Sequence, residues 1–420
     1  MRTKHATRGW FRTSILAALF AMVAVVAVAC SDDEEADKTP TGETPAASTS
    51  PTAAAAAGKV ITVKKGETIK IGISTTLTTD NAELGIPVRK AFEFAIKQKG
   101  TIQGFQLEAI AQDDQCAGPA SITAAEALIS AGVVAVLGPL CSGGTVAAFD
   151  AYDDAGILVI SGSASAVPVT AQGAEYFFRT AWNDKTQGAE MAKYVFNELN
   201  LTKAVLVNDQ SVYGKGLMDV FKASFTDLGG EVLSEEAVTV GEADFSPIVT
   251  KIEGEAPEIV VFGGFIAEGA VLVKQIRDAG ITSIFMGADG IATQSWVDQS
   301  QGAADGAYVS RGPVPADGSL FDAFVAAFTA SEGEAPGQFA EHSYDAANIM
   351  MAAIEKIATV DGDGNLVIDE AKLIAEVAKV DYVGASGQIR FNEVGDRIVI
   401  DPNIINRIDQ VTDGALKRIQ

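Results

Sequence analysis

The fold is decided by residues 133–145, which read VVAVLGPLCSGGT. Val133–Leu137 is a short, uninterrupted apolar run, typical of a strand that is buried on both faces of a parallel sheet. The loop that follows consists mostly of small and hydroxyl-bearing residues and leads into a helical pattern. A buried strand, a loop and a helix in this order form one unit of an α/β sheet.

The same alternation extends outward on both sides of this stretch. Strands are predicted at 69–73, 106–111, 204–207, 259–262 and 284–286, and helices at 85–99, 117–131, 214–228 and 267–279. Repeated βαβ units predict parallel sheets with right-handed crossovers. The patterned part spans about 350 residues, more than one hydrophobic core usually holds, so two lobes are expected.

The N-terminus has the pattern of an export signal. The first twelve residues contain four basic residues and no acid, and the apolar run Ile15–Ala29 follows. This predicts a cleaved signal peptide at 1–29, with an uncleaved membrane anchor as the alternative. Ala27–Cys30 resembles a bacterial lipobox, in which Cys30 is acylated and becomes the mature N-terminus. Ala27 stands where that pattern prefers Leu.

Residues 30–67 are predicted to be the lipidated Cys and a disordered acidic tether. Ser31–Gly58 contains six acidic residues and three prolines among Ser, Thr and Ala, so it cannot build a core. The formal net charge of the chain is −24, which argues against nucleic acid as a partner.

The two other cysteines, Cys116 and Cys141, lie outside the cytosol if the signal is genuine, where disulfides persist. A metal site is the alternative. It is disfavoured because His342 is the only histidine after residue 29 and no third thiol is available.

Catalytic signatures are missing from the sequence. It contains neither a G-x-S-x-G elbow nor a G-x-x-x-x-G-K-[ST] phosphate loop. Asp361–Asn365 reads like the start of an EF-hand, but Leu366 and Lys372 replace the required Gly and Glu. We therefore expect no enzyme activity, no cofactor and no metal.

Four loops that follow predicted strands are candidates for a binding site, because ligands of open α/β sheets bind beyond the carboxyl ends of the strands. Hydroxyls and backbone N–H groups near Ser142 and Ser165 suit an anionic carboxylate. Asp289 suits an ammonium group. Tyr213, Phe265 and Phe339 could wall the pocket. The alternative is that the serines cap helices, Asp289 belongs to a turn, and the aromatic residues are core.

From about Ile69 to Asn392 the chain resembles the leucine/isoleucine/valine-binding proteins, which are type I periplasmic binding proteins of ABC importers. Six stretches in the same order carry the resemblance: QDDQC at 112–116, GPLCS at 138–142, GILVIS at 156–161, YGKGL at 213–217, MGADG at 286–290 and YDAA at 344–347.

The resemblance implies specific residue roles. Ser142 and Ser165 would bind the α-carboxylate of an amino acid, helped by the backbone at Ser163. The Ser163 carbonyl, the Ser165 hydroxyl and Asp289 would receive its ammonium group. Four side chains would line the side-chain pocket: Leu84, Tyr213, Phe265 and Phe339. Cys116 and Cys141 match the family disulfide.

The chain departs from the family pattern at several of these positions. Members often have Thr in place of Ser165, Glu in place of Asp289, Tyr in place of Phe265 and Phe339, and an aromatic in place of Leu84. Asp for Glu keeps the charge with a shorter reach, and Phe for Tyr makes the pocket more apolar. The side-chain preference of the site therefore stays open.

The resemblance implies an α/β fold of two doubly wound parallel-sheet lobes joined by three hinge crossings. We place the first lobe at 68–183 plus 313–385 and the second at 184–312 plus 386–420. The expected protein is an extracytoplasmic, lipid-anchored solute-binding protein that captures an amino acid, branched-chain or otherwise apolar, for the permease subunits of an ABC transporter. A binder of urea, a short amide or an aromatic acid is the alternative, and an exported hydrolase is the disfavoured alternative of another class.

Overall fold

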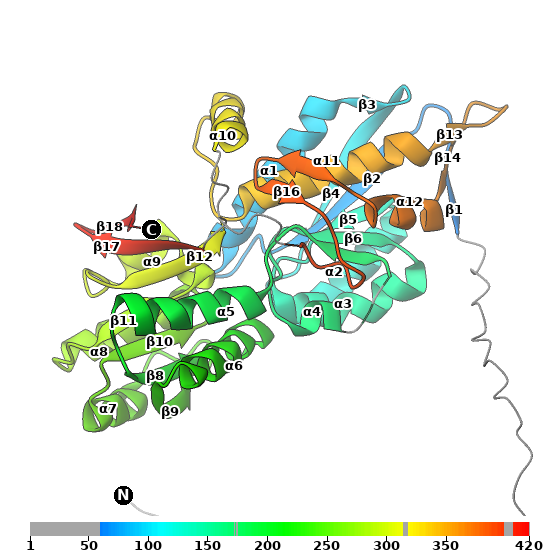
Figure 1. Cartoon of the computed structure of the whole chain (residues 1–420). Helices are drawn as coiled ribbons and strands as arrows, with labels where there is room; N and C mark the ends of the chain where they lie inside the picture. Colours follow the sequence, from blue (N-terminus) through cyan, green and yellow to red (C-terminus); the bar gives the residue numbers. More distant parts are fainter. Residues whose placement is uncertain (1–58, 172, 174, 314–317, 399–405, 420) are drawn as a thin grey trace, which may run out of the picture. The chain divides into compact units, whose positions relative to one another are not determined.

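The computed structural model describes residues 59–171, 173, 175–313, 318–398 and 406–419 (Figure 1). The predicted signal peptide, Cys30 and most of the predicted tether lie outside the described residues. The described chain contains one sheet of six strands, one of seven and two small ones.

The six-stranded sheet has the order β3-β4-β2-β5-β6-β7. Its strands are β2 (Ile69–Thr75), β3 (Thr101–Ile102), β4 (Phe105–Asp113), β5 (Ala135–Leu137), β6 (Leu158–Ser161) and β7 (Phe177–Arg179). All neighbours are parallel except β3 and β4. We call this sheet and the helices on it the first lobe.

Helices cover both faces of this sheet. Side chains on one face of β5, such as Leu137, pack with α1 (Ala82–Lys99) and α11 (Ala340–Ile357). Val136, on the other face, packs with α2 (Gly118–Ala131) and α3 (Ser142–Ala155). The strand is apolar throughout because both of its faces are buried. The remaining helices of the lobe are α4 (Pro168–Ala171), α10 (Ser319–Glu332) and α12 (Glu370–Val377).

The seven-stranded sheet has the order β18-β17-β12-β11-β10-β8-β9 and forms the second lobe. Its strands are β8 (Lys203–Asn208), β9 (Glu231–Ala237), β10 (Ile259–Gly263), β11 (Ile284–Gly287), β12 (Tyr308–Pro313), β17 (Asn406–Thr412) and β18 (Ala415–Arg418). The five strands from β8 to β12 are parallel, and β17 and β18 add an antiparallel edge.

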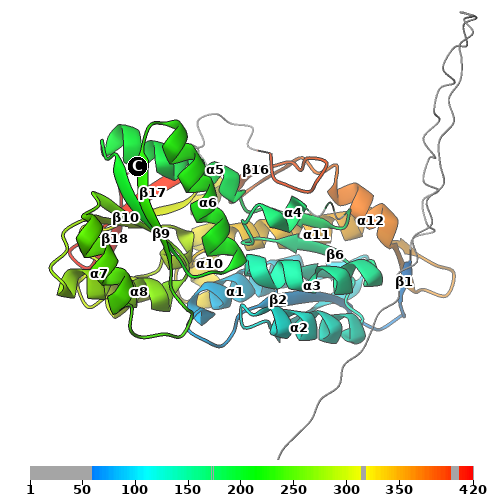
Figure 2. The ribbon, with the colours of Figure 1, turned by 90° about the horizontal axis from the view of Figure 1, so that it is seen from below.

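The helices of the second lobe connect these strands (Figure 2). They are α5 (Asp184–Lys193), the π-helical turn η1 (Tyr194–Glu198), α6 (Val212–Asp227), α7 (Ser246–Glu255), α8 (Ile266–Asp278), the 3₁₀ turn η2 (Asp289–Ile291) and α9 (Gln294–Gln299). The predicted strands and helices are therefore present, with ends that differ by a few residues. The α/β fold class is confirmed.

Each sheet reverses its strand order at one point, and these points position the site. In the first lobe the chain runs from β2 outward to β4 and then returns to β5 on the other side of β2. In the second lobe β8 lies between β9 and β10 in the same way. Such reversals open a crevice beyond the carboxyl ends of the strands, where ligands of this sheet type bind.

A strand lies within residues 30–67, which the sequence assigns to the tether. Val60–Val63 forms β1, which pairs antiparallel with β14 (Leu366–Asp369), and β13 (Thr359–Val360) completes a small sheet. The physical reason is local, since Val60, Ile61 and Val63 have strong strand preferences and Val63 is buried. The composition of the acidic stretch before Gly58 does not extend into this strand.

The third crossing between the lobes comes later than the predicted boundary at 385–386. The hairpin of β15 (Tyr382–Gly384) and β16 (Gly387–Ile389) stays on the first lobe, because Asp345 of α11 accepts hydrogen bonds from the backbone N–H groups of Ala385 and Ser386. Arg397 donates to the Thr180 carbonyl at 3.0 Å. Residues 386–397 thus belong to the first lobe, and the chain rejoins the second sheet at β17.

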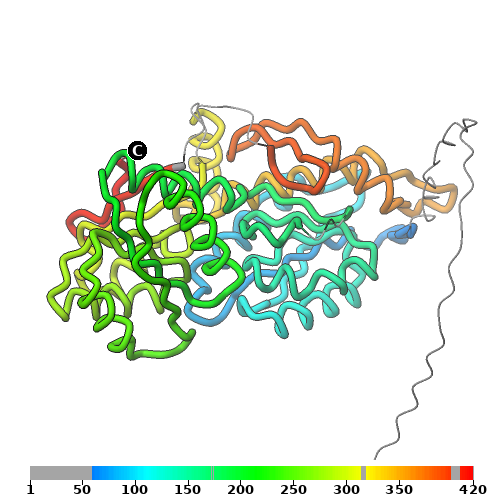
Figure 3. The backbone as a smooth tube through the Cα atoms, turned by 60° about the horizontal axis from the view of Figure 1, so that its bottom comes forward, coloured from blue at the N-terminus to red at the C-terminus, as the bar shows by residue number. Residues whose placement is uncertain are grey.

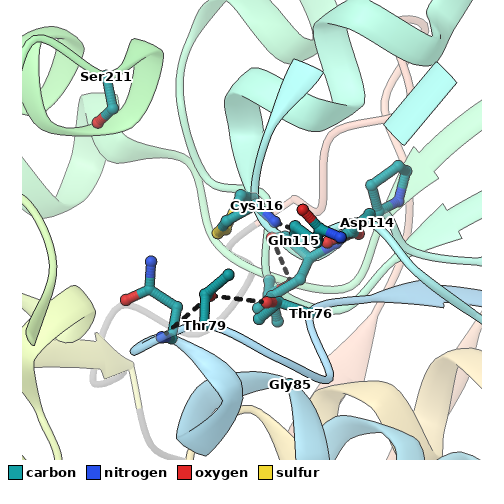
Figure 4. Close-up of a disulfide and its surroundings, with 12 residues drawn as sticks. Thr76, Thr79, Gly85, Asp114, Gln115, Cys116 and Ser211 are labelled. Carbon is teal, nitrogen blue, oxygen red and sulfur yellow. Dashed lines mark hydrogen bonds between the residues drawn. A yellow bond between two sulfur atoms is a disulfide. The ribbon is translucent and has the colours of Figure 1, made fainter. Parts of the chain in front are cut away.

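Cys116 and Cys141 form a disulfide with a Cα–Cα distance of 5.3 Å. Cys116 follows β4 and Cys141 follows β5, so the bond joins two loops at the same edge of the sheet. Figure 4 shows Cys116 in one loop with Asp114 and Gln115. Closing a loop with a sequence separation of 25 contributes roughly 3.5 kcal/mol on the chain-entropy model.

Candidate functional site

Two serine-bearing loops of the first lobe form one side of the site. Ser142 is the first residue of α3, and its hydroxyl accepts a hydrogen bond from the Ala166 N–H at 3.2 Å. The Ser163 hydroxyl donates to the Leu140 carbonyl at 2.8 Å. The loops after β5 and β6 therefore hold each other in place at the N-terminus of α3, where partial positive charge favours an anion.

A buried arginine holds the loop after β6 in place. Arg179 is completely buried, and its guanidinium donates to the carbonyls of Ala164 and Ala166 at 3.1 and 2.9 Å. It also forms an ion pair with Asp396. Arg179 has no distinctive sequence pattern, because its function depends on contacts between distant segments. The residue positions the Ser163–Ser165 loop without lining the pocket.

Asp289 provides the negative charge of the second lobe. It begins η2 after β11 and is almost fully buried. The Tyr213 hydroxyl donates to its Oδ1 at 3.0 Å and accepts from the Gly290 N–H at 3.1 Å. Burial raises the pKa of Asp289 to about 6, while Gln187, Tyr213 and Arg311 act in the opposite direction.

Gly290 is required by this arrangement. A Cβ at residue 290 would lie 2.4 Å from the Gly264 carbonyl oxygen and 2.9 Å from Cε1 of Tyr213. Neither distance is sterically allowed, so the close packing at this point depends on the missing side chain. The start of α6 meets the loops after β10 and β11 here.

Aromatic rings form the walls of the site. Tyr213 packs against Phe265 with ring centroids 5.4 Å apart, and Phe339 stacks on Trp182 at 5.7 Å. Phe339 has φ of 63°, an unusual backbone conformation for a residue of this type, immediately before α11. This conformation places a large apolar ring at the start of the helix. Behind that ring, a separate polar cavity of about 280 Å³ is lined by residues including Arg311, Glu341 and His342.

The structure brings all eight predicted ligand-binding residues together around one pocket between the lobes. Its volume is about 20 Å³. The lining residues are Leu84, Leu140, Cys141, Ser142, Ser163, Ser165, Tyr213, Phe265, Asp289, Gly290 and Phe339. Hydroxyls of the first lobe thus face a carboxylate of the second, with apolar walls between them. A volume of this size is only slightly more than one water molecule needs, so a larger ligand requires the lobes to move apart.

Asp184 is a residue of this region that no sequence pattern indicates. It is the first residue of α5, directly after the predicted crossing at 183–184, and its side chain is completely buried. Its N–H donates to the Ser165 carbonyl at 2.9 Å. Burial, and then the charge of Asp289, raise its pKa well above the usual value. In the sequence, Asp184 has the pattern of an ordinary acidic residue in the first turn of a helix. Only its position at a crossing between the lobes could have indicated that it lies near the site.

The chain is similar to known proteins over most of its length. Residues 68–409 match the model of the periplasmic binding protein family. A Leu/Ile/Val-binding protein homolog from Brucella melitensis is 30% identical over 332 residues, covering 78% of this chain and 88% of that protein. The leucine-, isoleucine-, valine-, threonine-, and alanine-binding protein of Pseudomonas aeruginosa is 28% identical, covering 79% and 87%.

Solved structures show the same fold. The substrate-binding protein of a branched-chain amino acid transporter from Streptococcus pneumoniae, crystallised with isoleucine, has a TM-score of 0.74 and 27% sequence identity. The match covers 84% of this chain and 98% of that one. Among the described residues, no helix combines the length and the apolar character needed to cross a membrane.

The fold and the inter-lobe pocket define a solute-binding protein of the two-lobed type. The chain belongs to the periplasmic binding protein family, and the resemblance found in the sequence is confirmed. Proteins of this family act outside the cytoplasm and bind substrates without converting them, which confirms the prediction that the chain is not an enzyme.

Proposed function

We propose that this protein binds an amino acid with an apolar, branched side chain in the pocket between its lobes and delivers it to the permease of an ABC transporter. The observation that carries the proposal is the pairing of serine hydroxyls of the first lobe with Asp289 of the second across one pocket. The relatives that bind leucine, isoleucine and valine support it.

The two ends of an amino acid fit the two sides of the pocket. Its carboxylate would accept hydrogen bonds from Ser142 and Ser165 near the N-terminus of α3. Its ammonium group would donate to Asp289 and to the Ser163 carbonyl. The side chain would contact Leu84 and the three aromatic rings, which offer no charge. Because Phe265 and Phe339 carry no hydroxyl, an apolar side chain is favoured over a polar one.

Contacts from both lobes couple binding to closure. A ligand that touches only one lobe makes only part of these contacts. The full set forms when both lobes close on the ligand, at a separation wider than the one described here. The ligand therefore stabilises the closed arrangement by the difference in its affinity for the two arrangements. The closed form would be the one that the permease recognises.

The ligand class can be tested by calorimetric titration of the purified protein after unfolding and refolding to remove bound solute. The panel is leucine, isoleucine, valine, alanine, acetamide, urea and benzoate, with 4-methylpentanoate as leucine without its amine. We expect the branched amino acids to bind most tightly and 4-methylpentanoate to bind at least tenfold more weakly, about 1.4 kcal/mol or more. Tighter binding of a neutral amide or of benzoate than of every amino acid contradicts the proposal.

The anchoring of the protein is a separate part of the proposal. Cys30 lies outside the described residues, and the support is the lipobox-like sequence that precedes it. We expect Cys30→Ser to release the protein from the membrane fraction or to block its processing. Membrane fractionation together with the mass of the mature chain measures both effects. If the variant fractionates like the wild type and has the mature mass expected without a lipid, Cys30 is not the anchor.

A further inference from the structure

Two arginines on neighbouring strands line the polar cavity behind Phe339. Arg311 of β12 and Arg407 of β17 lie directly opposite each other in the antiparallel register. Like charges at such a position destabilise a sheet unless another group neutralises them. Asp409, two residues further along β17, lies 2.7 Å from Nε of Arg311 and 2.5 Å from Nε of Arg407. One buried carboxylate is therefore shared by two guanidinium groups.

The two guanidinium groups have more donors than the protein uses. Each has five N–H groups. Among the described residues, Arg311 donates one hydrogen bond, from Nη1 to the Gln338 side-chain oxygen at 2.6 Å, and Arg407 donates one, from Nε to Asp409. The two arginine side chains are 20% and 29% exposed, so they stay accessible from the cavity. The wall of the cavity thus offers several N–H donors and positive charge at one place.

The size and the apolar walls of the cavity suit a small organic molecule. Its volume of about 280 Å³ is at the lower end of the range for cavities that bind such molecules. Both lobes contribute to it, since β12 and β17 belong to the second lobe and the start of α11 to the first. The apolar part of the wall consists of Trp182, Pro313, Phe321, Phe339 and Ala385.

The acidic groups of the cavity limit the charge of an occupant. Glu341 and Asp322 line it as well, together with a third cation, Arg418. The Glu341 carboxylate lies 3.8 Å from Nε2 of His342 and forms no ion pair with Arg311 or Arg407 within the described part of the chain. These acids repel a doubly charged anion more strongly than a singly charged one. The lining therefore favours a single carboxylate group over a phosphate dianion or a dicarboxylate.

We propose that this cavity is a second binding site, and that it takes a small monocarboxylate with an apolar or aromatic body. The carboxylate would accept hydrogen bonds from Arg311 and Arg407, because the planar guanidinium group presents N–H donors in pairs that match carboxylate oxygens. The body of the ligand would lie against Trp182 and Phe339. Among the described residues Phe339 alone lines both this cavity and the pocket, so the two sites are separate and the second does not depend on the proposed function.

The test is calorimetric titration of phenylacetate into the purified protein, without leucine and with saturating leucine, which occupies the pocket. We expect the wild type to bind phenylacetate in both cases, with a Kd below about 1 mM. The neutral analogue 2-phenylacetamide has nearly the same shape and should bind at least about tenfold more weakly, because it brings no charge to the arginines.

Arg407→Gln should weaken the binding of phenylacetate at least about tenfold, because it removes charged donors to the carboxylate. The fold should be preserved, since Arg311 still pairs with Asp409. Arg390→Gln is the matched control. Arg390 also pairs with an aspartate, but it is exposed and does not line the cavity, so this variant should bind phenylacetate like the wild type.

Several results would overturn the second site. These are no binding of phenylacetate by the wild type, equal affinity for 2-phenylacetamide, equal affinity in Arg407→Gln, and loss of binding in saturating leucine, which would place phenylacetate in the pocket. If Arg407→Gln does not fold, the two probes compared on the wild type, with and without leucine, decide alone. If leucine itself does not bind, the proposed function fails, and Arg407→Gln still decides whether the second site exists.

Discussion

Asp289→Asn is expected to weaken amino-acid binding by a factor of about 30 to several thousand. The substitution removes the charge that pairs with the ligand ammonium in a desolvated pocket, and breaking such a pair costs roughly 2–5 kcal/mol, at about 1.4 kcal/mol per tenfold change in affinity. Asn is close in size and can still accept from the Tyr213 hydroxyl, so the fold should be preserved. Calorimetric titration with the tightest ligand of the panel measures the loss.

Asp209→Asn provides the control for this experiment, because Asp209 is a buried acid of the second lobe that does not line the pocket. One Asp209 oxygen accepts from the N–H and the hydroxyl of Ser211, and the other has no partner among the described residues, so an amide can replace the carboxylate with little rearrangement. Its affinity should match that of the wild type. Equal affinity of Asp289→Asn and the wild type would show that Asp289 is only a turn residue. If the protein prefers a neutral amide, Asp289 instead accepts hydrogen bonds from the N–H groups of that amide.

Arg179→Met is expected to lower the free energy of unfolding by about 3–5 kcal/mol, because removing one partner of a buried ion pair leaves the other groups unsatisfied. The carbonyls of Ala164 and Ala166 and the carboxylate of Asp396 would lose their shared donor. Urea unfolding followed by circular dichroism measures this change. Ligand affinity should fall as well, because the loop that carries Ser163 and Ser165 loses its support.

Arg390→Met tests whether the burial of the ion pair causes the loss of stability expected for Arg179→Met. Arg390 also pairs with an aspartate, Asp381, but both side chains are exposed. Exposed pairs contribute little to stability, so the unfolding midpoint should hardly move. A similar loss in both variants would mean that the arginine stem, rather than the buried charge, explains the effect of Arg179→Met.

Much of the fold could be predicted because its buried strands appear in the sequence as uninterrupted apolar runs. Runs such as Val133–Leu137 and Ile259–Phe262 are apolar on both faces, and in a chain of this length only a covered parallel sheet accommodates several of them. The site could be predicted in part, since strand ends and their loops occur together in sequence. Serines and an aspartate after apolar strands were sufficient to indicate one pocket, whereas their roles still depend on the ligand experiments.

The features that the sequence did not show are those that depend on contacts between distant segments. Asp184 and Arg179 have ordinary local patterns, and their importance comes from Asp289 and Asp396, which lie more than a hundred residues away. The third crossing was placed too early because Ser386 and Arg397 are held by Asp345 and Thr180 of the first lobe. A short strand such as β1 is equally hard to recognise, because its pairing partner β14 is about three hundred residues further along the chain.

The position of β1 determines how a pull on the N-terminus would act on the molecule. The described chain begins at Lys59, whose ammonium group donates to the Ala155 carbonyl at 3.1 Å, and β1 then pairs with β14 within the first lobe. Figure 3 shows this blue segment at the end of the first lobe remote from the green segments of the second. Mechanical load from an N-terminal attachment would enter one lobe only and bypass the hinge. An anchored molecule should therefore open and close as freely as a released one, and affinities measured on released protein should apply at the membrane.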